Sequence, residues 1–286
     1  SKGEGLGNKF LANIRETDAI IHVLRCFDND NITHVDGSVD PVRDKEIIDI
    51  ELQLKDLESL NNRIEKVNRT AKSGDKDALR EKEILQKAIA FIESSNNIRS
   101  IDLDIADINK YLKPLQLITS KPVLYVCNVD ENSINSTNDH VESVKSLISK
   151  EGANLIVLAA GIESEINELD DYEERRMFLD DLGLDIPGSS KLINATYDLL
   201  NLQTYFTAGP KEVRAWTIQK MATAPQAAGV IHTDFEKGFI KAEVIAYNDY
   251  INYKTESKVK EAGKMRIEGK DYIVKNGDII HFLFNV

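Results

Sequence analysis

Cysteine is scarce in this sequence, because the 286 residues contain only Cys26 and Cys127. Each follows an apolar, strand-like run, and cytosolic proteins keep such thiols reduced. We therefore expect both to be reduced core residues of a cytosolic protein. The five histidines show no metal-ligand spacing with these cysteines or with each other, so the residues alone predict no metal site.

Long apolar runs are lacking as well. No stretch approaches the roughly 18 apolar residues that a membrane-spanning helix requires. The N-terminus also lacks the basic start and apolar core of a secretory signal peptide. We expect no membrane segment, although 42% of the residues are hydrophobic, which is enough for the cores of two or three domains.

Positive charge is in deficit. The formal net charge is −12, which argues against non-specific binding of duplex DNA as the main activity. The deficit is uneven, because residues 202–286 contain 12 Lys and Arg against 10 Asp and Glu, and the rest contains 24 against 38. This charge allows a local nucleic-acid contact in the C-terminal part without demonstrating one.

Three apolar runs rich in β-branched residues predict strands at 19–27, 121–129 and 153–161. Continuous apolar runs of this length suit strands that are covered on both faces, as in parallel sheets. Residues 139–152 are typical of a helix between the second and third run, which gives a β-α-β unit. The predicted fold class is therefore α/β with a parallel sheet.

The chain from Pro41 to about Lys113 has a charged, helical texture. Gly74 is a candidate helix stop and Asp75 a candidate N-cap, which places a second helix at about 76–95. We predict an antiparallel, coiled-coil-like helical hairpin inserted into the α/β domain, with a charged face that is solvated rather than nucleic-acid-binding. Its first helix has an apolar stripe at spacings of three and four: Ile50, Leu54, Leu57, Leu60, Ile64, Val67 and Ala71.

Beyond the third strand the pattern changes twice. Helices are expected at about 163–182 and 191–202, with a loop at 183–190 between them. A compact β-rich module follows, and its few strands with one helix fit a small β-grasp, ubiquitin-like domain. Its predicted strands are 211–218, 238–247 and 270–286, its helix is 256–269, and its turn is Asn276-Gly277.

Asn128 ends the second predicted strand and is followed by Val129, Asp130 and Glu131. Ligands of open α/β sheets bind at the carboxyl ends of strands, where GTPases carry Asn-Lys-x-Asp. In that motif the Asp accepts hydrogen bonds from the guanine N1–H and 2-amino groups. Here the Lys is replaced and the fourth residue is Glu, so we predict weakened guanine selectivity and use of ATP. The alternative is that Asn128 and Asp130 cap the following loop.

The third predicted strand ends in Ala159, Ala160 and Gly161. Small residues at this place let backbone N–H groups reach an exocyclic atom of a base. A tight strand-to-helix turn explains the same residues, and on local grounds it is the stronger interpretation.

Longer blocks of sequence carry a family resemblance. The whole chain resembles the YchF, or Obg-like ATPase, family, a branch of the Obg-related P-loop NTPases, and its C-terminal blocks are too long for a chance match. The blocks that carry the resemblance are "KGEGLGN" (2–8), "RCFDNDNITHVDGSVDP" (25–41), the motif at 128–131, "NLQTYFTAGPKEVRAWTI" (201–218), "APQAAGVIHTDFEKGFIKAEVI" (224–245) and "EAGKMRIEGKDYIVKNGDIIHFLFNV" (261–286).

The resemblance implies part of a P-loop NTPase domain. In the family a Walker A loop, a first switch and an Asp-x-Ala-Gly switch precede the stretch that matches Ser1, and the printed sequence contains no G-x-x-x-x-G-K-[ST]. We therefore expect the phosphate loop, and the ligands of the Mg²⁺ that accompanies ATP, in a preceding segment. Gly3, Gly5 and Gly7 then belong to the end of the second switch loop. The implied domains are G-domain parts at 1–40 and 114–201, the helical insertion at 41–113, and a TGS-type β-grasp domain at 202–286.

The resemblance also implies an unusual catalytic arrangement. The family replaces the water-orienting glutamine with a hydrophobic residue, so another group must position the attacking water. His34, in the polar loop 28–37, is our candidate, and a loop histidine with a structural hydrogen bond is the alternative. Phe27 is expected to stack on adenine, and Val129 to offer backbone atoms to the adenine edge.

The predicted function is that of a cytoplasmic, monomeric ATPase that hydrolyses ATP slowly and reports its nucleotide state to the ribosome or another partner. The small-residue segment 223–239, with Lys220, His232 and Lys237 nearby, suggests a docking surface for the ribosome or RNA. A loop packed against the other domains explains that segment equally well. Two other functions stay open: a nucleotide-independent scaffold for the ribosome or a protein, and a GTPase that tolerates the altered motif.

Overall fold

The computed structural model describes residues 2–34, 37–209 and 212–285. The chain folds into two compact units, Ser1–Thr196 and Tyr197–Val286. A few residues of the predicted segments lie outside the described ranges: Ser1, Val35, Asp36, Lys211 and Val286.

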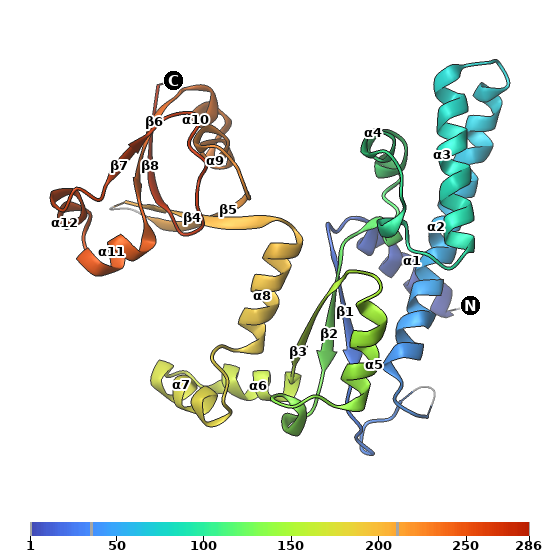
Figure 1. The fold of residues 1–286 in the computed structure, drawn as a ribbon, viewed down its shortest axis with the longest axis horizontal. Helices are drawn as coiled ribbons and strands as arrows, with labels where there is room; N and C mark the ends of the chain where they lie inside the picture. The colour runs from blue at the N-terminus through green and yellow to red at the C-terminus, as the bar shows by residue number, and fades with distance from the viewer. Residues whose placement is uncertain (1, 35–36, 210–211, 286) are drawn as a thin grey trace. The chain divides into compact units, whose positions relative to one another are not determined.

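The first unit is built around a parallel sheet in the order β1-β2-β3 (Figure 1). β1 (Ile20–Arg25) pairs with β2 (Val123–Asn128), and β2 pairs with β3 (Asn154–Leu158). Helix α5 (Asp139–Ile148) connects β2 to β3. The predicted α/β class, the three strands and this helix are therefore confirmed. The central strand is buried from Val123 to Cys127, which explains its unbroken apolar run.

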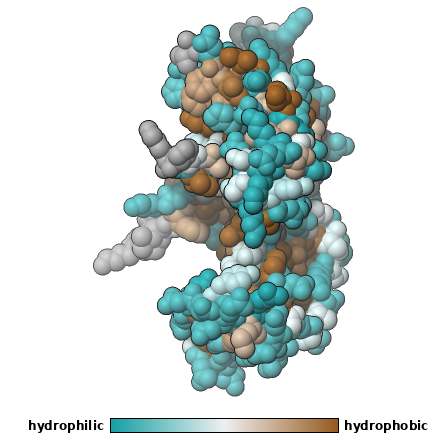
Figure 2. Space-filling model, turned by 90° about the vertical axis from the view of Figure 1, so that its left-hand side faces the viewer, coloured by the Kyte–Doolittle hydropathy of each residue, from teal (hydrophilic) through white to brown (hydrophobic). Residues whose placement is uncertain are grey.

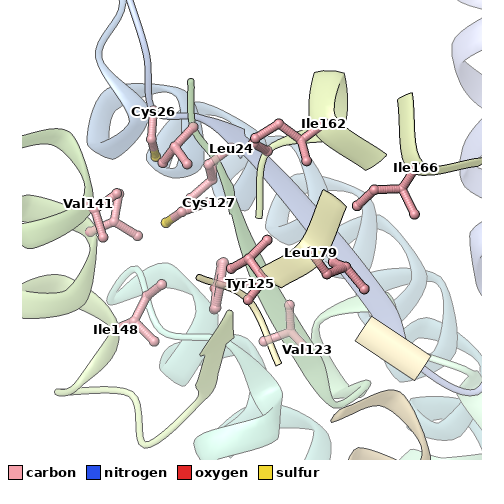
Figure 3. Close-up of a cluster of buried hydrophobic side chains, with 14 residues drawn as sticks. Leu24, Cys26, Val123, Tyr125, Cys127, Val141, Ile148, Ile162, Ile166 and Leu179 are labelled. Atoms are coloured by element: carbon pink, nitrogen blue, oxygen red, sulfur yellow. The ribbon is translucent and has the colours of Figure 1, made fainter. Parts of the chain in front are cut away.

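Side chains from the sheet and its helices meet in the core shown in Figure 3. α6 (Ala160–Glu168) and α7 (Tyr172–Asp181) contribute to it, together with β2 and α5. Cys26 and Cys127 are free thiols with no exposed surface, as predicted for core residues. A hydrogen bond with Cys127, together with burial, raises the pKa of the Cys26 thiol, so this cysteine stays protonated near neutral pH.

The glycine-rich start of the chain is helical. Helix α1 (Lys2–Arg15) contains Gly3, Gly5 and Gly7, so the expectation of a loop at these glycines is wrong. The helix is anchored farther along by the buried Leu11, and each glycine lowers helix stability by only about 1 kcal/mol relative to alanine. The role of the three glycines in a switch stays a prediction.

Helices α2 (Pro41–Ala71) and α3 (Lys76–Glu93) form the predicted antiparallel hairpin (Figure 1). Gly74 separates them with φ of +82°, in the left-handed region that favours glycine. Asp75 caps α3, because its side chain accepts a hydrogen bond from Ala78 N at 2.7 Å. Both predicted boundary residues therefore act as expected.

Only the second half of the predicted apolar stripe on α2 is buried. Leu60 and Val67 are buried in one cluster with side chains of α3, whereas Ile50 and Leu54 are 53% and 62% exposed. The first half of the helix buries polar side chains instead: Lys45, Asp49, Gln53 and Asp56. Helical periodicity thus continues along α2, but the chemistry of the buried face changes midway.

The predicted helix 163–182 is interrupted between α6 and α7. Asp171 starts a new helix there, because its Oδ1 accepts from Glu173 N at 2.8 Å. Helix α8 (Gly188–Leu199) begins inside the predicted loop 183–190. Its start is fixed by the Glu163 carboxylate, which accepts hydrogen bonds from Gly188 N and Ser189 N. Short helical turns lead from α3 to β2: η1 (Ile98–Ser100), α4 (Ile105–Asp107), η2 (Ile108–Leu112), η3 (Lys113–Leu115) and η4 (Ile118–Ser120).

The second unit contains a separate mixed sheet in the order β5-β4-β8-β6-β7. The first and last of these strands along the chain, β4 and β8, are parallel neighbours, and the other pairs are antiparallel. β4, α9, α10 and α11 were not predicted, and the predicted helix 256–269 covers both α12 and β7. The elements are β4 (Leu202–Ala208), β5 (Val213–Gln219), α9 (Ala224–Ile231), α10 (Thr233–Lys237), β6 (Phe239–Ile245), α11 (Tyr247–Tyr253), α12 (Glu256–Glu261), β7 (Arg266–Glu268) and β8 (Ile279–Phe284).

The small residues of segment 223–239 belong to the core of this second unit. Ala224, Ala227 and Ala228 lie on α9 and have no exposed surface. The Tyr205 hydroxyl donates to the Ala227 carbonyl at 2.9 Å, which holds the helix to the sheet. The alanines are thus explained by a helix packed on its own sheet rather than by a loop. Docking through the flanking cations stays a prediction.

The molecular face in Figure 2 is mainly hydrophilic, with hydrophobic residues gathered in small groups. Exposed apolar side chains of the second unit include Val213, Met221 and Ile267. Within the described ranges, no helix combines the length and the apolar character that crossing a membrane requires.

Candidate functional site

The carboxyl ends of the three parallel strands bring together several of the predicted site residues. The register places Arg25 beside Asn128, and Asn128 beside Leu158. The loop that leads from β1 to α2 and the start of α6 leave the sheet at this same end (Figure 1). Open α/β sheets bind ligands at this position.

Asn128 ties the ends of β2 and β3 together. Its Oδ1 accepts a hydrogen bond from Ala160 N at 2.9 Å, and Val129 N donates to Leu158 O at 2.9 Å. The N–H of Ala160 is therefore used inside the protein, which corrects the expectation that this group reaches a base. For Val129, the carbonyl oxygen is the backbone atom that matches the amino donor of adenine.

Helix α6 starts at the same corner, and its own N-cap residue, Ala159, provides no side-chain acceptor. Its N-cap residue Ala159 is only 2% exposed, whereas Gly161 in the first turn is exposed. The first N–H groups of a helix have no partner within the helix. A Cβ built on Gly161 would meet no atom within 4 Å, so the space directly beside this residue is open.

The two acidic residues of the Asn-Val-Asp-Glu motif differ in their surroundings. Asp130 caps the short turn η5 (Glu131–Ser133), because its Oδ1 accepts from Ser133 N at 2.9 Å. This confirms the capping interpretation for Asp130. Glu131 is exposed, so its carboxylate is the motif's remaining acid for contact with a ligand.

Phe27 lies beside the end of β2. The strand ladder continues past β1, because Cys26 N donates to Asn128 O at 2.8 Å. The guanidinium carbon of Arg25 lies 4.9 Å from the centroid of the Phe27 ring. A half-buried aromatic ring next to Asn128 is suited to stacking on a base.

The side chain of His34 is bound to helix α2. Its Nε2 lies 3.0 Å from Asp44 Oδ2, and the two side chains are 18% and 25% exposed. Asp44 belongs to the first turn of α2, whose N-cap is Asp40. This pairing agrees with a loop histidine that makes a structural hydrogen bond, and it leaves the catalytic role a prediction.

Three further residues at this corner were missed in the sequence. Arg25 donates hydrogen bonds to backbone carbonyls of the loop after β1. Asn138 caps α5 and also donates from Nδ2 to the Cys26 carbonyl at 2.8 Å. His140 Nε2 lies 3.2 Å from Asp28 Oδ2. The N-cap position of Asn138 was readable from the sequence, but its second contact depends on the fold.

The residues described in the structure include no group of three or more His, Cys, Asp and Glu side chains arranged to hold a metal ion. The predicted Mg²⁺ therefore has no ligand set in these parts of the chain, and its association with ATP stays a prediction.

Comparison with known proteins gives a consistent result. The family model described as "YchF-GTPase_C: Protein of unknown function (DUF933)" matches residues 202–285. The chain is 56% identical over 286 residues to "Ribosome-binding ATPase YchF" of Pasteurella multocida, covering 100% of this chain and 78% of the relative. It is 52% identical over 288 residues to the protein of the same name from Bacillus subtilis, with the same coverage of each chain.

A solved structure is similar as well. It is described as "Structure of the Schizosaccharomyces pombe YchF GTPase" and matches with a TM-score of 0.82 and 36% sequence identity. The match covers 96% of this chain and 75% of that chain. It thus includes nearly all of both units described above.

Proposed function

Since the chain belongs to the YchF family, we propose that it is a nucleotide-binding ATPase that hydrolyses ATP slowly and couples its nucleotide state to the ribosome. Its bacterial relatives are named ribosome-binding ATPases and match the whole of this chain. The similar solved structure is named a GTPase. Nucleotide hydrolysis is common to these names, and the preference for ATP is the finer part of the proposal.

The hydrogen bond between Asn128 and Ala160 carries the proposal. At 2.9 Å it joins the ends of two neighbouring strands and fixes the corner where α6 begins. Phe27 supplies an aromatic surface beside this corner, and the first turn of α6 supplies N–H groups. A planar ring with polar edges is the ligand chemistry that such a corner accepts.

The carboxylates of the motif favour adenine over guanine. A guanine-binding site needs an acceptor placed for both the N1–H and the 2-amino group. Asp130 already accepts from Ser133 N, and Glu131 occupies the fourth position with a longer side chain. Because adenine has no N1–H, it loses nothing at such a site, and its amino group can donate to the Val129 carbonyl.

We assign hydrolysis to positioned water. A water oxygen bonds to the γ-phosphorus while the bond to the β–γ bridging oxygen breaks, which releases ADP and phosphate. His34 is proposed to hydrogen-bond this water, with Asp44 holding the imidazole ring. Mg²⁺ neutralises phosphate charge when it is bound with ATP, and its ligands are expected in the segment that precedes the family's second switch.

Coupling to the ribosome is assigned to the helical hairpin of α2 and α3 and to the second unit. Helix α2 begins beside His34, so a change in that loop reaches the hairpin directly. The second unit is proposed to be a TGS-type β-grasp domain, which its strand order with parallel β4 and β8 supports. RNA contact through this unit, a monomeric state and a cytoplasmic location are parts of the same proposal. A nucleotide-independent scaffold is not favoured, because the relatives are named ATPases.

Titration of the full-length protein with ATP and with GTP tests the proposal. Tighter binding and faster hydrolysis of ATP are expected, and a clear preference for GTP would refute the choice of nucleotide. Co-sedimentation with ribosomes should depend on the nucleotide present. If His34→Ala retains both ATP affinity and full turnover, His34 has no part in the mechanism.

A further inference from the structure

Arg25, the last residue of β1, organises the loop that follows it. Its Nε donates to Phe27 O at 3.1 Å, Nη1 donates to Ile32 O at 3.0 Å, and Nη2 donates to Asn29 O at 3.2 Å. One side chain thus satisfies three carbonyl groups within six residues of backbone. We call residues 27–32, which this side chain gathers, the Arg25 loop.

The geometry of these bonds requires a guanidinium group. Arginine presents five N–H donors in a rigid plane, whereas lysine presents one ammonium that cannot reach three separated acceptors from one position. Within the loop, Asn31 N donates to the Asn29 side chain and Ile32 N donates to Asn29 O. These bonds close a local turn, but they do not attach that turn to the strand. Arg25 makes the attachment.

Arg25 also fixes the ring that is proposed to stack on the base. Its guanidinium carbon is 4.9 Å from the centroid of Phe27, within the range of a cation–π contact. The cation occupies one side of the ring, so a base must stack on the other. A ring that is already held in place loses less freedom when the ligand binds.

Three further contacts hold the chain around this loop: one lies just before it, one lies within it and one lies beyond it. Asn138 binds the Cys26 carbonyl, and His140 lies 3.2 Å from Asp28. His34 is anchored separately, through Asp44 on α2. Loss of the Arg25 contacts therefore frees the middle of the loop and the Phe27 ring, while His34 keeps its own anchor.

We infer that Arg25 is a positioning residue that sets the affinity for adenine nucleotide by holding Phe27 and its loop in the binding conformation. This inference rests on the proposed function, because it assumes that the base stacks on Phe27. It predicts an effect on nucleotide binding and not on the chemical step.

The test compares Arg25→Lys with wild type in the full-length protein. The variant keeps the positive charge but loses at least two carbonyl bonds, so the KM for ATP should rise about tenfold. The kcat should stay within about twofold, as expected when an interaction common to ground and transition states is removed. Hydrogen–deuterium exchange should become faster in residues 26–33 and stay unchanged in β2.

Arg214→Lys is the matched control. Arg214 lies on a strand of the second unit, and its guanidinium carbon is 4.0 Å from the centroid of the Trp216 ring. The same substitution therefore removes the same kind of arginine–aromatic contact in the other unit of the chain. It should leave KM and kcat for ATP unchanged.

The possible outcomes separate the two hypotheses. If wild type binds ATP and Arg25→Lys binds it equally well, the role of Arg25 is wrong and the proposed function stands. If kcat falls while KM is unchanged, or if hydrogen–deuterium exchange becomes faster throughout the sheet, Arg25 does not act by holding Phe27 and its loop. The inference is then also wrong. If wild-type protein binds no adenine nucleotide, the proposed function fails and this inference fails with it.

Discussion

Helix α2 is continuous, but its two halves bury side chains of different polarity. The half that starts at the α/β domain buries Lys45, Asp49 and Asp56, whereas the distal half buries Leu60 and Val67. Neighbours explain the difference, because the first half faces polar groups of the α/β domain and the second half faces α3. The comparison shows that burial on this helix follows its partner and not its own apolar stripe.

Hydrogen bonds and ion pairs connect the polar half of α2 to the α/β domain. Lys45 Nζ donates to Asp49 Oδ2 at 2.6 Å and also bonds to Glu151, which accepts from the Tyr125 hydroxyl at 3.1 Å. Burial by itself lowers the pKa of Lys45, but the hydrogen bonds with Asp49 and Glu151 outweigh it and raise that pKa. Burial raises the pKa of Tyr125 to about 12. Near neutral pH the lysine is therefore charged and the tyrosine neutral, which suits every bond in the network.

Polar and apolar burial have different consequences. An apolar contact tolerates small shifts, but a buried ion pair is favourable only in a narrow geometry. We therefore expect the network to set the geometry at which the hairpin joins the α/β domain, while the apolar half holds the hairpin together. The following variants test this division. Each is judged by how much it changes the free energy of unfolding and, for Lys45, by how that change depends on pH.

Leu60→Ala should have the largest effect. Leu60 is fully buried among side chains of the hairpin, so the variant should lower the free energy of unfolding by about 4 kcal/mol through lost burial and a residual cavity. Urea unfolding followed by circular dichroism at 222 nm measures the loss. Fluorescence of Trp216, the only tryptophan and a residue of the second unit, is the internal control. A cost below 1 kcal/mol would show that the hairpin is not a well-packed core.

Lys45→Met should cost nearly as much, about 3 kcal/mol, because it leaves Asp49 and Glu151 without their shared cation. Adding Glu151→Gln should recover part of this loss, and the double-mutant cycle measures the coupling. If Lys45→Met is neutral, the network does not stabilise the first half of α2.

Wild type and Lys45→Met should also differ in how their stability depends on pH. The folded-state pKa of Lys45 is raised, so its contribution is complete below the unfolded value of about 10.4 and is lost as pH rises through the folded value. The stability difference between wild type and Lys45→Met should therefore be constant from about pH 7 to 10 and decrease above that range. A difference that grows with pH would contradict this assignment.

The fold could be predicted in its regular parts. The three parallel strands have mainly apolar runs, and the hairpin has a capping Asp75 and a positive-φ Gly74 between its helices. β4 was not predicted, because its residues directly follow the helical pattern of α8 in the sequence. The break before α7 was not predicted, because Asp171, which caps α7, lies inside a continuous helical pattern.

At the candidate site, the sequence indicated which residues lie at this end of the sheet but not the bonds between them. Asn128 was predicted from its place at a strand end and Phe27 from the family resemblance, and the strand ladder places Cys26, the residue before Phe27, beside Asn128. The bond from Ala160 N to Asn128, and the three bonds from Arg25, link residues whose distance in space depends on the finished fold. No local pattern encodes such bonds, so sequence reasoning assigned the Ala160 N–H to a ligand.

Asp56→Asn tests the far end of the polar half with an intermediate effect. Asp56 has no exposed surface and accepts from Ile118 N at 2.9 Å, from Thr119 N at 2.7 Å and from the Thr119 hydroxyl. Asparagine replaces one acceptor oxygen with a donor that faces these donors, so about 2 kcal/mol of stability should be lost. Urea unfolding gives the value, and Asp75→Asn, which keeps a good N-cap residue, is a control that should change little.

Leu54→Gln should have the smallest effect, within about 0.5 kcal/mol, and it tests most directly whether the stripe or the neighbouring element decides burial. Leu54 belongs to the same predicted stripe as Leu60, six residues earlier, yet it is 62% exposed while Leu60 is buried. If the apolar stripe itself stabilised the helix, both substitutions would be costly, whereas if the neighbour decides, only Leu60→Ala will be. A loss of more than 1 kcal/mol for Leu54→Gln in the same urea experiment would mean that Leu54 is covered in solution. The change from polar to apolar burial along α2 would then lie nearer to Leu54 than the structure places it.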